Sequence, residues 1–250
     1  MKTFITKHKL ISILAVIFLI GIWQLVSMIA GSSHIFPSPS QTLIAFVEII
    51  RSETFIPSIG STIIRGIIGF IIALILAFML GIPAGMSRSV FLFINPILVS
   101  IRSTPVISII LLAIIWLGNQ RVPVFIALLT MFPIICGNII EGIRNVDKSL
   151  IEMGGVYKVG KRKILTGISI PSIIPFLTGG ISNALGFGWR AIIIGEVLSQ
   201  PSMGIGSRMQ DAQTFLMVSD LIAWTLIAII ISSVFEWIMR FAESRFITWR

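Results

Sequence analysis

Long apolar runs, separated by shorter polar segments, make up most of this chain. A helix that crosses a bilayer needs about twenty mostly apolar residues, and six runs meet that length. The pattern therefore predicts an all-α integral membrane protein with about six transmembrane helices, with residues 1–250 forming a single domain. The predicted spans are Leu10–Ala30, Thr62–Met86, Phe91–Leu117, Val122–Ile140, Ser172–Leu198 and Phe215–Met239.

The first two runs carry features that bear on how they fold. Lys2, Lys7 and Lys9 precede the first run, as in a signal peptide. Its 21 uncharged residues are long for the apolar part of a signal peptide, so we expect an uncleaved first helix. In the second run, Gly81 and Gly85 form a small-residue pair at a spacing that permits close packing of two helices.

Composition agrees with a membrane protein and argues against a nucleic-acid partner. Hydrophobic residues make up 56% of the chain and charged residues 12%, and the mean hydropathy is +1.03. A soluble domain would carry about a quarter charged residues, so most of this chain faces lipid or other apolar helices. The net charge of +9 comes from residues between the apolar runs, with no basic stripe interleaved with aromatics.

The distribution of Lys and Arg predicts the orientation in the membrane, because cytoplasmic loops carry an excess of them. With the N-terminus inside, 13 of these residues fall on the cytoplasmic side and only three, Arg51, Arg121 and Arg208, on the opposite side. Both termini are therefore predicted to be cytoplasmic, and residues Asn145–Ile170 to face the cytosol. On the outer side, Ser40 is the expected N-cap of a short surface helix over Thr42–Arg51.

Metal and nucleotide sites have little support in the sequence. Cys136 is the single cysteine, and it lies within an apolar run, so neither a disulfide nor a cysteine metal site is expected. Residues Gly155–Arg162 approach a phosphate-binding loop, but Arg162 stands where that motif needs a Ser or Thr hydroxyl for Mg²⁺. The chain is thus expected to bind no cofactor and to be no enzyme.

A basic, polar segment, Gly142–Pro171, interrupts the apolar pattern. By itself it is typical of a solvated cytoplasmic loop. Its Glu152, followed sixteen to nineteen residues later by Ile168-Ser169-Ile170-Pro171, resembles the EAA signature of permease subunits in binding-protein-dependent ABC importers. Further matches, in order from Phe36 to the C-terminus, resemble the nitrate/sulfonate/taurine-type branch: Phe36-Pro37-Ser38-Pro39-Ser40, Arg102-Ser103-Thr104-Pro105, Phe132-Pro133-Ile134-Ile135, Gly142-Ile143-Arg144-Asn145-Val146-Asp147 and Glu152-Met153-Gly154.

The resemblance implies a type I ABC importer permease fold in a bacterial cytoplasmic membrane. It implies a homodimer of this chain with two ABC ATPase subunits, which bind ATP and Mg²⁺, and an extracytoplasmic solute-binding protein. A short helix in the basic segment would dock on the ATPase. The family's first signature glycine falls on Lys158, and both signature alanines are replaced. The residues expected to couple to the ATPase are Asp147, Leu150, Ile151, Glu152, Met153, Gly154, Val156, Gly160, Ile168, Ile170 and Pro171.

Three charges within the spans are candidates for the translocation path, because charges at membrane depth usually face a cavity or a partner. Arg102 lies in the third run, between Pro96 and Pro105, and either lines the inner mouth or reaches the headgroups. Arg190 and Glu196 lie in the fifth run, six residues apart, which does not favour an ion pair within one helix. Residues Gly186–Trp189 either break this helix or pack tightly against a neighbour.

The solute is less defined than the class of protein. Members of the branch carry small anions such as nitrate, alkanesulfonates and taurine, and others import pyrimidine thiamin precursors or riboflavin. Residues Gly206–Leu216 with Ile222–Thr225 resemble the pyrimidine-precursor members more. The main alternative is an ion-gradient-driven secondary transporter, which would show internal repeats and acidic residues deep in the spans. A membrane-embedded enzyme would need clustered acidic or His residues, and the ten acidic residues are scattered.

Overall fold

A computed structural model describes residues 2–246, and all regular structure in this part of the chain is helical. The elements follow one another in the order α1 (Lys2–Ala30), α2 (Pro39–Arg51), α3 (Phe55–Met86), α4 (Arg88–Ser103), α5 (Val106–Leu117), α6 (Val122–Arg144), α7 (Lys148–Val156), α8 (Lys161–Ile164), the π-helical turn η1 (Leu165–Ser169), α9 (Ile170–Ser199), α10 (Ile205–Thr214) and α11 (Val218–Phe246).

The predicted class, an all-α membrane protein, is confirmed. Within the described residues, four helices are long and apolar enough to cross a membrane, and a bent pair brings the number to five. These numbers are close to the six spans predicted. The first run, Leu10–Ala30, is helical throughout as part of α1, and it is not counted among these spans. The four single helices are Phe55–Met86, Val122–Arg144, Arg162–Ser199 and Val218–Ile238.

The third predicted span, Phe91–Leu117, which Pro96, Arg102 and Pro105 interrupt in the sequence, is sharply bent in the structure. The chain forms α4 and α5, and their axes differ by 96°. The break falls at Thr104 and Pro105, which have extended ψ angles of 130° and 122°. Proline lacks an N–H and disfavours helical geometry in the residue before it, so the helix ends here. Pro96, in contrast, stays inside α4.

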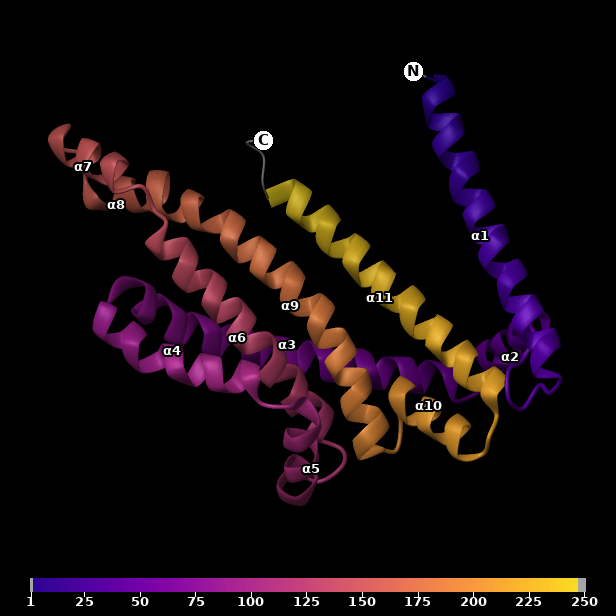
Figure 1. The fold of residues 1–250 in the computed structure, drawn as a ribbon. Helices are drawn as coiled ribbons and strands as arrows, with labels where there is room; N and C mark the ends of the chain where they lie inside the picture. Colours follow the sequence, from indigo (N-terminus) through magenta and orange to yellow (C-terminus); the bar gives the residue numbers. More distant parts are fainter. Residues whose placement is uncertain (1, 247–250) are drawn as a thin grey trace.

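α6 lies at the centre of the bundle and packs along α3 on one side and α9 on the other (Figure 1). Its buried residues include Ile126, Met131 and Ile139, each exposed by 1% or less. The predicted close packing at Gly81 and Gly85 is confirmed, because both glycines of α3 face α6. A Cβ atom on Gly85 would lie 2.8 Å from Cβ of Ile143.

α9 continues the π-helical turn and α8, so that residues Arg162–Ser199 form one helical stretch of 38 residues. The expectation that residues Gly186–Trp189 break this helix is wrong. The alternative, tight packing against a neighbouring helix, is confirmed at Gly188. A Cβ atom there would collide with the side chain of Met131 on α6. Gly186 faces open space instead.

The surface helix after the first run begins earlier than predicted. Ser38, and not Ser40, is the N-cap of α2. The Ser38 hydroxyl accepts a hydrogen bond from the Gln41 N–H at 3.3 Å, and the Gln41 side chain accepts one from the Ser38 N–H at 2.9 Å. This reciprocal capping box, with Pro39 in the first turn, stabilises a helix that begins three residues earlier than predicted.

The two ends of the molecule carry different segments of the chain. The start of α1, the end of α11 and the α7–α8 segment lie toward one end, whereas α2, α5 and α10 lie toward the other (Figure 1). α1 contacts the rest of the chain mainly through α2. The arrangement agrees with the predicted orientation, in which the termini and the basic segment share one side of the membrane.

Candidate functional site

The segment between α6 and α9 forms a helical hairpin at one end of the bundle (Figure 1). Asp147 caps α7, because its Oδ1 atom accepts hydrogen bonds from the Ser149 hydroxyl at 2.6 Å and the Ser149 N–H at 2.8 Å. These bonds hold the pKa of the Asp147 carboxyl below its ordinary value. The carboxylate also lies at the positive end of the helix dipole, which favours its charge. The start of α7 is therefore well defined.

α7 presents apolar side chains to solvent. Leu150, Ile151, Met153 and Val156 are exposed by 39%, 37%, 49% and 79%. The Glu152 carboxylate is exposed among them. A helix that leaves this much apolar surface uncovered at the end of a bundle is typical of one that docks in a partner's groove.

Gly154 is the buried face of α7. A Cβ atom at this position would lie 3.1 Å from both Cδ1 and Cγ1 of Ile164 on α8. The two arms of the hairpin are therefore held close together by the absence of a side chain at Gly154. This is the third position of the Glu-Met-Gly triplet, where the family has alanine.

The turn after α7 depends on Lys158. Its φ angle is +52°, the left-handed conformation that glycine adopts at low cost. The Val159 N–H bonds to the Gly154 carbonyl at 2.8 Å, and the Lys158 N–H to the Gly155 carbonyl at 3.0 Å. These two bonds form a Schellman motif. The position where the family has its first glycine thus keeps a glycine-like backbone although it carries a lysine.

The far end of the predicted coupling segment is not a loop. Ile168 lies in the π-helical turn, Ile170 begins α9, and Pro171 is in its first turn. The expectation of a polar loop up to this point is wrong, because the helix of the fifth run starts about ten residues earlier than predicted. Ile170 is 45% exposed, whereas Ile168 and Pro171 are half-buried. Gly160 faces open space just before α8.

The hairpin is anchored to the rest of the bundle through Arg144, at the end of α6. Its guanidinium lies 3.7 Å from the centre of the Phe91 ring on α4, a cation–π contact. It also donates a hydrogen bond to the Ala84 carbonyl of α3 at 3.3 Å. Three helices therefore meet where the chain enters the hairpin.

Glu196 lies near the other end of α9, and its side chain is fully buried. Its carboxylate pairs with Arg65 of α3 at 2.7 Å and accepts hydrogen bonds from the Thr62 hydroxyl at 2.9 and 3.0 Å. The Gly206 N–H donates a further bond at 3.0 Å. Arg190 takes no part, in line with the expectation that Arg190 and Glu196 do not pair. The carboxylate faces protein on every side, and it lines neither of the cavities described below.

The loop between α9 and α10 closes over this carboxylate. A Cβ atom on Gly204, whose φ is +158°, would lie 2.6 Å from the Glu196 carboxyl carbon. Arg65 also donates to the Met203 carbonyl at 2.6 Å. The sequence reasoning did not assign Arg65, Thr62 or Gly204 to a site. The available signal was that Arg65 and Glu196 are isolated, opposite charges near the outer ends of two predicted spans.

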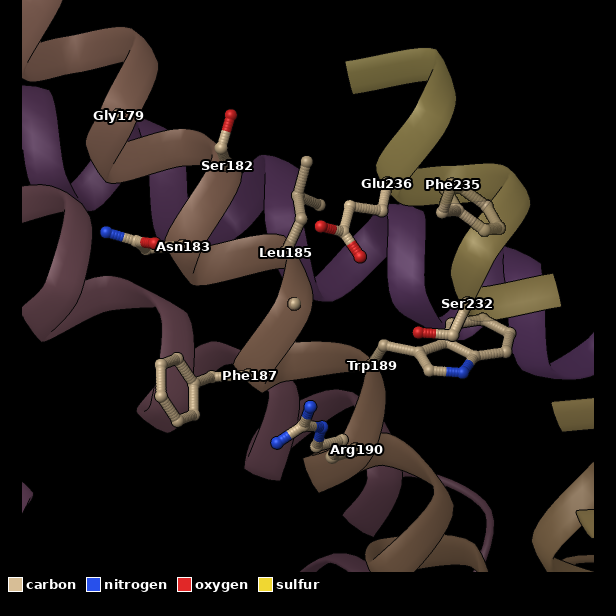
Figure 2. A pocket seen from close by; sticks show the side chains of 11 residues that line it. Gly179, Ser182, Asn183, Leu185, Phe187, Trp189, Arg190, Ser232, Phe235 and Glu236 are labelled. Atoms are coloured by element: carbon tan, nitrogen blue, oxygen red, sulfur yellow. The ribbon is translucent and has the colours of Figure 1, made fainter. Parts of the chain in front are cut away.

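Arg190 lines a cavity of about 450 Å³ between α9 and α11 (Figure 2). The cavity is lined on the α9 side by Ser182, Asn183 and Phe187 and on the α11 side by Ser232 and Glu236, among others. No hydrogen bond or ion pair joins the Arg190 side chain to another residue in the described part of the chain.

Arg102 lines a second cavity, of about 440 Å³, among α4, α5, α6 and α9. Its guanidinium donates a hydrogen bond to the Pro133 carbonyl of α6. Gly137, one turn further along α6, leaves room for it, because a Cβ atom there would lie 2.5 Å from Nη2 of Arg102. Thr130, Asn138 and Glu141 add polar groups to the lining.

Apolar helices long enough to span a membrane, an exposed apolar helix at one end and two cavities lined by arginines are features of a membrane permease. The family model described as "Binding-protein-dependent transport system inner membrane component" matches residues 73–248. The chain belongs to this family, the permeases of ABC importers, and its predicted place in the nitrate/sulfonate/taurine-type branch is confirmed.

Three relatives illustrate the branch. The chain is 28% identical to a Bacillus subtilis protein named as an aliphatic sulfonates transport permease, SsuC, over 93% of this chain and 84% of the relative. It is 30% identical to the Escherichia coli SsuC, over 79% and 76% of the two chains. Its identity to the taurine transport system permease protein TauC of Escherichia coli is 22%, over 98% and 91%.

Proposed function

We propose that this chain is the membrane subunit of an ATP-driven importer and that α7 is its contact with the ATPase. The observation that carries the proposal is the exposed apolar surface of α7, held out by the hairpin at one end of the bundle. Its ridge of Leu150, Met153 and Val156 would enter a groove of the ATPase, and Glu152 would fix the register. This mode of recognition, an amphipathic helix in a partner's groove, is recurrent.

The partners follow from the two ends of the molecule. The ATPase subunits, which bind ATP and Mg²⁺, would dock at the α7–α8 end, in the cytoplasm. The solute-binding protein would deliver its cargo at the end that carries α2, α5 and α10, outside a bacterial cytoplasmic membrane. Two copies of this chain would enclose the path between them. The family match favours this assembly over an ion-gradient-driven secondary transporter.

We propose a small anion of the sulfonate or taurine type as the solute. The names of the relatives support it, as do the arginines in both cavities. The resemblance of residues Gly206–Leu216 to pyrimidine-precursor permeases carries less weight, because these residues serve the fold. The Gly206 N–H binds Glu196, and Trp224, just beyond, is buried in the core.

The test is reconstitution of the chain with the ATPase encoded beside its gene. In detergent, Glu152→Ala and Met153→Asp should each weaken binding of the ATPase at least tenfold, and in vesicles they should abolish ATP hydrolysis stimulated by the binding protein. Glu48→Ala, on α2 at the other end, is the matched control and should bind the ATPase as the wild type does. Wild-type affinity in both α7 variants would contradict the docking role.

A further inference from the structure

The two cavities meet at one side chain. Phe187 of α9 lines both of them, and it is the only residue common to the two linings. Its ring is 56% exposed and projects from α9 beside Arg190 (Figure 2). One cavity thus holds Arg190, the other holds Arg102, and Phe187 borders both.

We place Phe187 and both arginines near the middle of the membrane by counting residues from the outer ends of their spans. Phe187 is twelve residues from Ser199, the outer end of its helix, which corresponds to about 18 Å at 1.5 Å per residue. Pro133, whose carbonyl accepts the bond from Arg102, is eleven residues from the start of α6, or about 16 Å. The hydrocarbon core is about 30 Å thick, so both positions are close to its midplane. Charges at this depth are costly and mark solute paths.

The arginines retain hydrogen-bonding capacity toward a ligand. A guanidinium has five N–H donors. Arg102 uses one of them on the Pro133 carbonyl, and the side chain of Arg190 makes no hydrogen bond to another described residue. The guanidinium of Arg190 lies on the Phe187 side of its cavity, whereas Glu236 enters from α11 (Figure 2). The planar fork of arginine matches the oxygen atoms of an oxyanion.

We propose that Arg190 and Arg102 are two successive binding stations for a small oxyanion at mid-depth, and that Phe187 is the barrier between them. This inference rests on the proposed function and adds the residues that would hold and separate the solute. Phe187 is 56% exposed, so the ring has room to turn. With the ring in place the two cavities are separate, and when it turns the anion passes from one arginine to the other.

The barrier is tested in vesicles that contain the full chain alone, loaded with radiolabelled ethanesulfonate. Phe187→Ala should raise its passive efflux at least tenfold over the wild type. Efflux of Rb⁺ should stay at the wild-type level, because the two arginines repel cations. Phe93→Ala is the matched control, since Phe93 is 75% exposed on α4 and lines neither cavity. A variant that is merely misfolded would leak both ions.

The stations are tested with the complete importer, reconstituted with its ATPase and binding protein. Arg190→Gln should lower ATP-driven ethanesulfonate uptake at least tenfold while the ATPase still binds, and Arg190→Lys should recover part of the rate. Phe187→Trp, which enlarges the barrier, should slow uptake without any leak.

Two results would overturn the proposal: no excess leak through Phe187→Ala over Phe93→Ala, or wild-type uptake by Arg190→Gln. A wild-type importer that takes up no ethanesulfonate would instead contradict the solute class of the proposed function. The leak assay uses neither ATP nor a partner, so it judges the barrier separately.

Discussion

Glu196 and Arg65 are opposite charges in two otherwise largely apolar helices, and the fold brings them within 2.7 Å of each other. Taking such a pair out of water is costly, and the cost is offset only when hydrogen bonds satisfy the remaining atoms. Here Thr62 and the Gly206 N–H complete the shell of the carboxylate, and the Met203 carbonyl binds the guanidinium. The pair therefore joins α3 and α9 to the loop before α10.

Glu196→Ala should lower the free energy of unfolding by about 3 kcal/mol, the lower end of the range for a buried pair, because it leaves the largely buried guanidinium of Arg65 without its counter-charge. Thermal unfolding of the detergent-solubilised protein measures the loss. The control is Asp211→Ala, which removes the partner of Arg208 in an exposed pair. Such surface pairs contribute about 0–1 kcal/mol. Similar midpoints for the two variants would show that the network is not a stabilising one.

Lys158→Gly should stabilise the turn after α7 by about 1 kcal/mol, because a lysine at a φ of +52° pays a steric cost that glycine avoids. Slower amide hydrogen exchange over residues 148–160 is the expected result. Lys163→Gly, within the helical stretch that leads to α9, is the opposite control and should speed exchange. Faster exchange in both variants would mean that the Lys158 side chain itself holds the turn.

Residue-level prediction from sequence succeeded where a residue acts locally and was limited where it acts at a distance. The tight packing at Gly81 and Gly85 follows from a short-range pattern, and the structure has it. The partner of Glu196 could not be derived, because Arg65 lies 131 positions away. Only the folded arrangement of α3 and α9 brings the two together.

Packing among the helices depends on glycines of α3 that face α6. A Cβ atom on Gly69 would lie 2.6 Å from Cβ of Ala127 and 3.1 Å from the Val124 carbonyl oxygen. Neither of these atoms can move aside by rotation of a side chain. Gly60, on the same helix, has nothing within 4 Å of its Cβ position.

Gly69→Ala should therefore destabilise the protein by about 1–3 kcal/mol, the usual cost of overpacking. Gly60→Ala should leave stability unchanged or raise it slightly, because alanine favours a helix interior. The unfolding midpoints of the two variants, measured in the same detergent, give the comparison. Equal unfolding midpoints for Gly69→Ala and Gly60→Ala would mean that α3 and α6 can move apart at Gly69 with little loss of stability.

At the level of whole elements, apolar length predicted which segments are helical but not where a helix bends or ends. The run from Phe91 to Leu117 is long enough for one span, yet Pro105 divides it at a sharp angle. Pro96 and Pro175 lie in helices that continue, so a proline alone does not determine where a helix ends. Conversely, residues 161–169 are too polar to be read as part of a span, but they extend α9 by nearly ten residues.

For the molecule as a whole, the two ends differ in what they present: exposed α7 at one, and α2 and α10 at the other (Figure 1). We predict that a membrane-impermeant maleimide labels Gln213→Cys, on α10, from outside intact cells and leaves Ser149→Cys, on α7, unlabelled until the cells are opened. Cys136 is fully buried and should give no background. Labelling of Ser149→Cys in intact cells would show that the protein has the orientation opposite to the predicted one.

The unbroken course of α9 has a mechanical consequence. Its 38-residue stretch is about 57 Å long, and it packs along α6, where Gly180 and Gly188 leave no room for a side chain. One end of the stretch leads into the α7–α8 hairpin, and the other is tied through Glu196 to α10. Because the helical stretch is continuous between them, a displacement of the hairpin would be carried along α9 to the loop before α10, at the opposite end of the molecule.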